Sequence, residues 1–172
     1  MPTLVIMRHS RAERPLGCPD VDRPLSESGR ADALVAADML ASRSGTRATV
    51  ALVSPSQRTR ETWAIVAPRL PHARALIEPG LYEAEADEVL ECAAERAIEE
   101  REACETLIIV GHNPAMHESA LALLAGTPGI PPELGRRFPT SAFARIRLSS
   151  WSTLPRGDAV LEDFAIPRAS SD

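Results

Sequence analysis

Three short apolar runs, each followed by a segment with helical spacing of its apolar residues, constrain the fold of this chain more than any other feature. The runs are Thr3–Met7, Thr49–Val53 and Thr106–Val110. Apolar runs of this length, without polar alternation, are typical of strands that are buried on both faces of a parallel sheet. Strands that alternate with helices predict an α/β domain built around a mainly parallel sheet.

The other elements are predicted from apolar spacing and turn residues. Helices are expected over Ser28 to about Ser42, from the Ser54–Ser56 turn to about Leu70, over Glu85–Ala103, and over Pro114–Leu124 with proline at its first position. Further strands are expected at Ala75–Ile77, Ala142–Leu148 and Ala159–Ala165, and Gly126–Thr140 reads as a connection. The 172 residues fit one domain over residues 1–166, followed by a flexible tail over residues 167–172.

The chain contains no lysine, so all 19 of its basic residues are arginines. This composition excludes a Walker A phosphate loop, a kinase of the usual kind and enzymes that form a Schiff base, because each of them needs a lysine. The net charge of -5 argues against nucleic acid as a partner. A phosphate site in this chain must therefore use arginine, histidine and backbone N–H groups.

The cysteines and the N-terminus predict the compartment. Cys18, Cys92 and Cys104 are odd in number and form no CxxC motif, which favours free thiols in a reducing compartment; Cys92 and Cys104 are expected in a helix. The first apolar run is too short for a signal sequence, and no stretch approaches the ~20 apolar residues of a membrane span. We expect a cytoplasmic protein that contacts no membrane and, because no cluster has metal-ligand spacing, needs no metal or cofactor.

Polar side chains with phosphate chemistry follow each of the three apolar runs. They lie in Arg8-His9-Ser10, in Ser54-Pro55-Ser56-Gln57-Arg58 and in Gly111-His112-Asn113-Pro114. Ligands of open α/β sheets bind beyond the carboxyl ends of the strands, so these side chains are expected to meet. Two arginines can grip a phosphoryl group, one imidazole can attack phosphorus, and a second imidazole can stabilise the transition state. The pattern predicts metal-free phosphoryl transfer.

The same motifs resemble those of a known family. Leu4–Ser10 resembles the strand and Arg-His-Gly signature of the histidine phosphatase, or phosphoglycerate mutase-like, superfamily; Ser54–Thr62 resembles its second arginine motif and Val110–Pro114 the motif of its second histidine. The short length, with Asp22–Ser26 and Phe138–Ala142, resembles the SixA-type phosphohistidine phosphatases. The resemblance spans residue 3 to about residue 148 and implies a three-layer αβα sandwich with an antiparallel edge to its sheet.

The resemblance also implies roles for individual residues. His9 would be the phosphorylated nucleophile, and the phosphate pocket would be completed by Arg8, Arg58 and His112. Ser10 and Asn113 are further candidates for substrate binding; Ser10 replaces the usual glycine, and its hydroxyl either contacts phosphate or is merely tolerated. Leu81-Tyr82-Glu83 matches the pattern of the general acid, so Glu83 is its candidate; the alternative is a solvated loop carboxylate.

Several functions remain open at this point. The first is a phosphatase that acts on phosphohistidine in proteins; the alternatives are a small-molecule phosphatase, a mutase, or a phosphate-binding module without activity. Hydrolysis is favoured over mutase activity because the chain lacks the long insertions that would shield the intermediate from water. The presence of all four pocket residues counts against an inactive module. We expect a monomer. Asp22 and Arg23 either order the loop beside the pocket or form a local ion pair.

Overall fold

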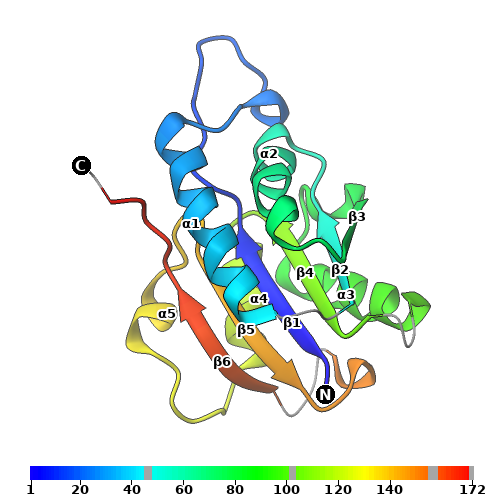
Figure 1. Ribbon diagram of the computed structural model, residues 1–172. Coiled ribbons are helices and arrows are strands. Elements are labelled where there is room, and N and C mark those ends of the chain that lie inside the picture. The colour runs from blue at the N-terminus through cyan, green and yellow to red at the C-terminus, as the bar shows by residue number, and fades with distance from the viewer. Residues whose placement is uncertain (45–47, 101–103, 155–158, 171–172) are drawn as a thin grey trace.

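A mixed sheet runs through the centre of the computed structural model (Figure 1). The structure describes residues 1–44, 48–100, 104–154 and 159–170, and within these ranges six strands are arranged in the order β3-β2-β4-β1-β5-β6. Helices cover both faces of this sheet. The predicted three-layer α/β architecture is thereby confirmed.

The parallel part of the sheet contains the three apolar runs. β1 (Thr3–Arg8) pairs with β4 (Thr106–Gly111), which pairs on its other side with β2 (Thr49–Val53), and β3 (Ala73–Ile77) forms the edge. β2 and β4 are buried along their whole length, as their apolar composition requires, whereas β3 is exposed or half-buried at the edge.

The antiparallel part lies on the other side of β1. β5 (Phe143–Leu148) runs antiparallel to β1, and β6 (Ala159–Ala165) runs antiparallel to β5. The expected antiparallel edge is therefore present, and β6 has the predicted bounds. Just beyond β6, the backbone N–H of Ala169 donates to a carboxylate oxygen of Asp32 over 2.9 Å. Residues 171–172 of the predicted tail lie outside the described residues.

Two helices cover each face of the sheet. α1 (Glu27–Ser44) and α2 (Gln57–Val66) pack on one face, and α3 (Ala86–Glu100) and α4 (Ala115–Leu123) pack on the other (Figure 1). Residues 101–103, which the predicted third helix included, lie outside the described residues. Within the described ranges, no helix is both long and apolar enough to cross a bilayer.

The core follows from the alternation of side chains along each strand. On β1, Val5 and Met7 join the buried cluster that contains α1 and α2, whereas Leu4 and Ile6 join the cluster that contains α3 and α4. Both clusters are dominated by aliphatic side chains. A chain with 3% aromatic residues thus buries its sheet through Ala, Val, Leu and Ile.

Proline explains most of the differences from the predicted helix bounds. α2 ends at Val66 and continues as a 3₁₀ turn, Ala67–Arg69, because Pro68 cannot donate to the helical ladder. Pro114 precedes α4 as its cap rather than forming its first residue.

The connection Gly126–Thr140 contains a short helix, α5 (Pro132–Arg136), which the sequence did not predict. The predicted place of Cys104 was wrong: it is buried just before β4, outside α3.

Candidate active site

Three strand ends bring the predicted residues to one edge of the sheet. Arg8, the last residue of β1, pairs with Gly111, the last residue of β4, so that His9 and His112 emerge side by side. Their ring centroids are 5.2 Å apart. Ser54 follows β2 at the same edge, and its hydroxyl lies 2.7 Å from His112.

The ring of His9 is held in one tautomer. Its Nδ1 lies 2.7 Å from the carbonyl oxygen of Ser10, and a carbonyl can only accept, so Nδ1 carries the proton and Nε2 carries the lone pair. The pKa of His9 is lowered from 6.5 to about 3, mainly by burial and to a smaller extent by His112, Arg58 and Arg8, while the hydrogen bond to the Ser10 carbonyl acts in the opposite direction. The side chain is therefore a neutral imidazole with a free Nε2 lone pair.

Arg8 and Asn113 converge on one carbonyl group. Nη1 of Arg8 and Nδ2 of Asn113 donate to the carbonyl oxygen of Phe138 over 3.1 and 2.8 Å. Nε of Arg8 and Oδ1 of Asn113 are buried without a hydrogen-bond partner in the described part of the chain. The carbonyl fixes both side chains in place, and Arg8 retains N–H groups that can donate to an anion.

Arg58 is bound by a carboxylate that the sequence did not predict. The side chain is buried in the first turn of α2, and its Nη1 and Nη2 donate to the backbone oxygen and to Oδ2 of Asp20, over 2.6 and 2.9 Å. Asp20 also accepts from the hydroxyl of Tyr82 and from Arg23. Hydrogen bonds from Tyr82, then Arg23 and Arg58, hold the pKa of Asp20 well below its usual range. The guanidinium of Arg58, which was predicted to bind phosphate, thus forms an ion pair with the carboxylate of Asp20.

His112 is held in the opposite tautomer from His9. Its Nδ1 lies 3.3 Å from Nη2 of Arg58, and because a guanidinium nitrogen can only donate, Nδ1 must be the acceptor. The proton of the ring is therefore on Nε2, which donates to the hydroxyl of Ser54. Burial, followed by the charge of Arg58, lowers the pKa of His112 to about 4. The ring of Tyr82 lies edge-on at 5.6 Å between centroids.

Ser10 is buried and hydrogen-bonded to two other parts of the chain. Its side chain is fully buried, its backbone N–H donates to Oγ1 of Thr62 on α2, and its hydroxyl accepts from Ser141 at 2.7 Å. Ser10 therefore ties the end of β1 to α2 and to the segment before β5. The hydroxyl of Ser10 is not on the wall of the cleft described below.

Glu83 lies apart from the other predicted residues. It is exposed, and it does not line the cleft, whereas its neighbour Tyr82 reaches Asp20 and His112. Of the two roles considered for Asp22 and Arg23, the ion pair between them is not formed, because Arg23 binds Asp20 instead. Arg23 does hold the loop, since its Nε donates to the carbonyl oxygen of Glu13 over 2.8 Å. The place of Ser54 directly after a buried strand was a usable signal, whereas nothing in the sequence distinguished Asp20 from its neighbours.

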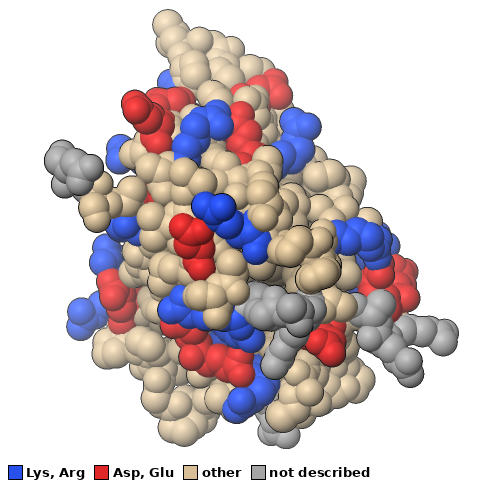
Figure 2. Space-filling view, viewed as in Figure 1, with Lys and Arg blue, Asp and Glu red and all other residues tan. Residues whose placement is uncertain are grey.

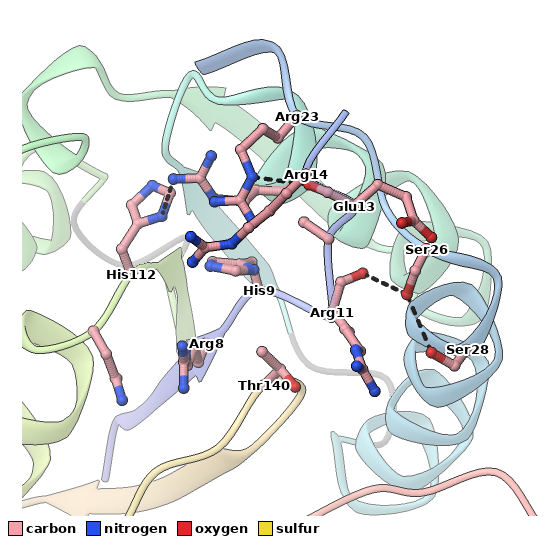
Figure 3. A pocket seen from close by; sticks show the side chains of 13 residues that line it. Arg8, His9, Arg11, Glu13, Arg14, Arg23, Ser26, Ser28, His112 and Thr140 are labelled. Carbon is pink, nitrogen blue, oxygen red and sulfur yellow. Dashed lines mark hydrogen bonds between the residues drawn. The ribbon is translucent and has the colours of Figure 1, made fainter. Parts of the chain in front are cut away.

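A cleft of about 760 Å³ opens over these residues (Figure 3). Its wall includes five of the seven predicted residues, namely Arg8, His9, Arg58, His112 and Asn113. The rest of the wall is formed by Arg11, Ala12, Glu13, Arg14, Arg23, Ser26, Ser28 and Thr140. Across the described ranges, no three His, Cys, Asp or Glu side chains are grouped so that they could hold a metal ion.

Comparison with known proteins decides the family. The model of the histidine phosphatase superfamily (branch 1) matches residues 4–103, which is more than half of the chain. The chain belongs to the histidine phosphatase superfamily. An uncharacterized protein of Mycobacterium tuberculosis is 32% identical over 94% of this chain and 100% of its own length.

Solved structures agree with this membership. The SixA protein of Nakamurella multipartitia, to which a phosphohistidine phosphatase activity is attributed, is 28% identical with a TM-score of 0.81 over 96% of each chain. The corresponding SixA protein of Agrobacterium tumefaciens is 25% identical with a TM-score of 0.77, over 97% of this chain and 99% of its own. The chain is a phosphatase of the superfamily, in its SixA-type branch.

Proposed function

We propose that this protein dephosphorylates phosphohistidine side chains of other proteins, through a covalent phosphohistidine intermediate on His9 and without a metal ion. The observation that carries the proposal is the state of His9. Its imidazole is neutral, its Nδ1–H is bound to the Ser10 carbonyl, and its Nε2 lone pair is free. A neutral imidazole with a fixed tautomer is a competent nucleophile toward phosphorus.

The proposed first step transfers the phosphoryl group to His9. Nε2 attacks phosphorus while the bond from phosphorus to the leaving nitrogen breaks, and the ring of His9 becomes positively charged. The Ser10 carbonyl stabilises that charge through Nδ1–H, and Arg8 donates to the phosphoryl oxygens. Arg58 joins Arg8 by exchanging its contacts with Asp20 for contacts with the phosphoryl oxygens, and it supplies further positive charge. In the second step water attacks phosphorus, the bond to Nε2 breaks, phosphate leaves, and the proton of the water passes to solvent.

His112 is proposed to stabilise the transferring group. Its pKa of about 4 keeps it neutral before substrate binds. A dianionic phosphoryl group beside it favours the protonated form and raises this pKa. Protonation at Nδ1, the nitrogen that faces Nη2 of Arg58, lets His112 donate to a phosphoryl oxygen in the transition state.

The state of Asp20 and Glu83 favours phosphohistidine over an alkyl phosphate as the substrate, because neither carboxylate is set up to protonate a leaving group. An alkoxide leaving group needs a proton in the transition state, whereas a phosphorylated imidazole that is protonated at its other nitrogen leaves as a neutral ring. Asp20 is ionised and bound to Arg58, and Glu83 is exposed outside the cleft. The activity attributed to the SixA proteins supports the same substrate class.

The experiment compares two leaving groups on one peptide. Phosphate release is measured from a phosphohistidine peptide and from its phosphoserine counterpart, with His9→Ala protein as the control for spontaneous hydrolysis. We expect His9-dependent release to be faster from phosphohistidine and to survive dialysis against a chelator. Faster release from phosphoserine would favour the small-phosphoester alternative, and loss with the chelator that a divalent ion restores would contradict metal independence.

A further inference from the structure

The cleft continues beyond the phosphoryl-binding residues along the loop that joins β1 to α1. This loop contributes Arg11 and Arg14 to the wall. In Figure 3 the side chain of Arg14 extends from the loop toward His9, whereas that of Arg11 lies beyond His9 near Thr140, on the side away from His112. Both side chains therefore lie on the wall of the cleft, one reaching toward His9 and the other beyond it.

The backbone of Arg11 is held in place while its side chain is not. Its carbonyl oxygen accepts from the backbone N–H of Ser26 over 2.9 Å and from the hydroxyl of Ser26 over 3.2 Å. A Cβ on Gly29 would lie 2.0 Å from that carbonyl oxygen, so only glycine lets α1 begin this close to Arg11. The exposed guanidinium thus projects from a fixed position.

Arg11 and Arg14 carry charge that the protein does not neutralise. Within the described residues, neither side chain has an ion-pair or hydrogen-bond partner, whereas Arg58 and Arg23 share the carboxylate of Asp20. Elsewhere, on the face drawn in Figure 2, arginines and acidic residues are intermixed. Five arginines line this cleft in a protein of net charge -5, and the single acidic residue among the residues that line it is Glu13.

The surplus exceeds what one phosphoryl group requires. A phosphoryl dianion carries a charge of about -2 at neutral pH, whereas the five cleft arginines, set against the carboxylates of Glu13 and Asp20, leave a formal charge of +3. Two further guanidinium groups without partners repel one another and the pocket arginines unless an anion joins them. Guanidinium groups bind carboxylates and phosphates in a planar, paired geometry.

We infer that Arg11 and Arg14 bind a second anionic group of the substrate, a carboxylate or a second phosphate, while the first phosphoryl group reacts at His9. The inference rests on the proposed phosphatase function. In a phosphoprotein the second group is an acidic side chain beside the phosphorylated residue; in a small substrate it is an acid group of the molecule itself.

The test uses probes that differ only in the second charge. One pair is 3-phosphoglycerate and its methyl ester; the other is a phosphohistidine peptide with flanking Glu and the same peptide with flanking Gln. For each pair, the ratio of kcat/KM for the charged over the neutral member is measured in the wild-type protein and in Arg11→Ala, Arg14→Ala and Arg14→Glu. Arg60→Ala is the matched control, because Arg60 is exposed on α2 and does not line the cleft.

The inference predicts that the ratio exceeds one in the wild-type protein for at least one pair, and the pair identifies the source of the second charge. Arg14→Ala should lower the ratio about tenfold, the effect of one charge-assisted contact; Arg14→Glu should lower it further and Arg60→Ala should not change it. A ratio near one for both pairs, or one that Arg11 and Arg14 variants leave unchanged, would overturn the inference while His9-dependent turnover leaves the proposed function intact. Absence of turnover with every probe would instead refute the proposed function.

Discussion

The two walls of the cleft are built in different ways. The wall formed by the strand ends and the first turn of α2, called the strand wall below, holds His9 and Arg58 almost fully buried, with hydrogen bonds that fix their orientation. The wall on the loop between β1 and α1 presents Arg11 and Arg14, which are exposed and have no partner among the described residues. Catalysis needs groups that are oriented before the substrate arrives, whereas recognition can use groups that order when it binds. The strand wall is therefore expected to determine rate and the loop wall to determine substrate choice.

The largest expected effect is at the strand wall. His9→Ala removes the proposed nucleophile, so we expect kcat to fall by at least about 10⁴-fold for every phosphate substrate. The measurement is steady-state turnover of p-nitrophenyl phosphate, with circular dichroism as the control for folding. Substantial activity in the folded variant would mean that the strand wall does not carry the chemistry.

A smaller effect is expected at Ser54, which acts through His112. Removing its hydroxyl leaves Nε2–H of His112 without its acceptor and releases the ring, so Ser54→Ala should lower kcat about tenfold with little change in KM. Ser54→Thr retains the hydroxyl and should restore most of the lost rate. Equal losses in Ser54→Ala and Ser54→Thr would show that the site responds to packing rather than to this hydrogen bond.

The smallest expected effect is at Glu83, outside both walls. Glu83→Gln should reduce hydrolysis of an alkyl phosphate and of a nitrophenyl phosphate by less than about twofold, whereas loss of a general acid costs about 10²–10⁴-fold with a poor leaving group. Glu85→Gln, another exposed loop carboxylate, is the matched control. A large loss confined to the alkyl phosphate would identify Glu83 as the proton donor despite its exposure.

The sequence predicted the sheet and the strand wall because both depend on short-range patterns. A buried parallel strand must be apolar on both faces, so Thr3–Met7 and Thr106–Val110 are recognisable, and the residues that follow them must emerge at one edge. This places His9 and His112 together from sequence alone. The antiparallel edge came from the family resemblance and is confirmed by β5 and β6.

The contacts that orient the side chains around the cleft could not be predicted because they are long-range. Asp20 lies in a loop rich in proline and polar residues, and its partner Arg58 is 38 residues away. Ser10 bonds Ser141 across 131 residues. Tyr82 rather than Glu83 reaches the site, because the 3₁₀ turn Pro79–Leu81 sets the direction of the residues that follow it. The Leu-x-Glu pattern does not encode that direction.

The most direct test of the account is the chemical identity of the phosphorylated enzyme. The protein is mixed with labelled phosphohistidine peptide, quenched in alkali within milliseconds, and digested for mass spectrometry and ³¹P NMR. The account predicts a phosphoryl group on Nε2 of His9, since the Ser10 carbonyl holds Nδ1. A phosphoryl group on Nδ1 or on another residue, or no labelled enzyme under conditions of rapid turnover, would contradict it.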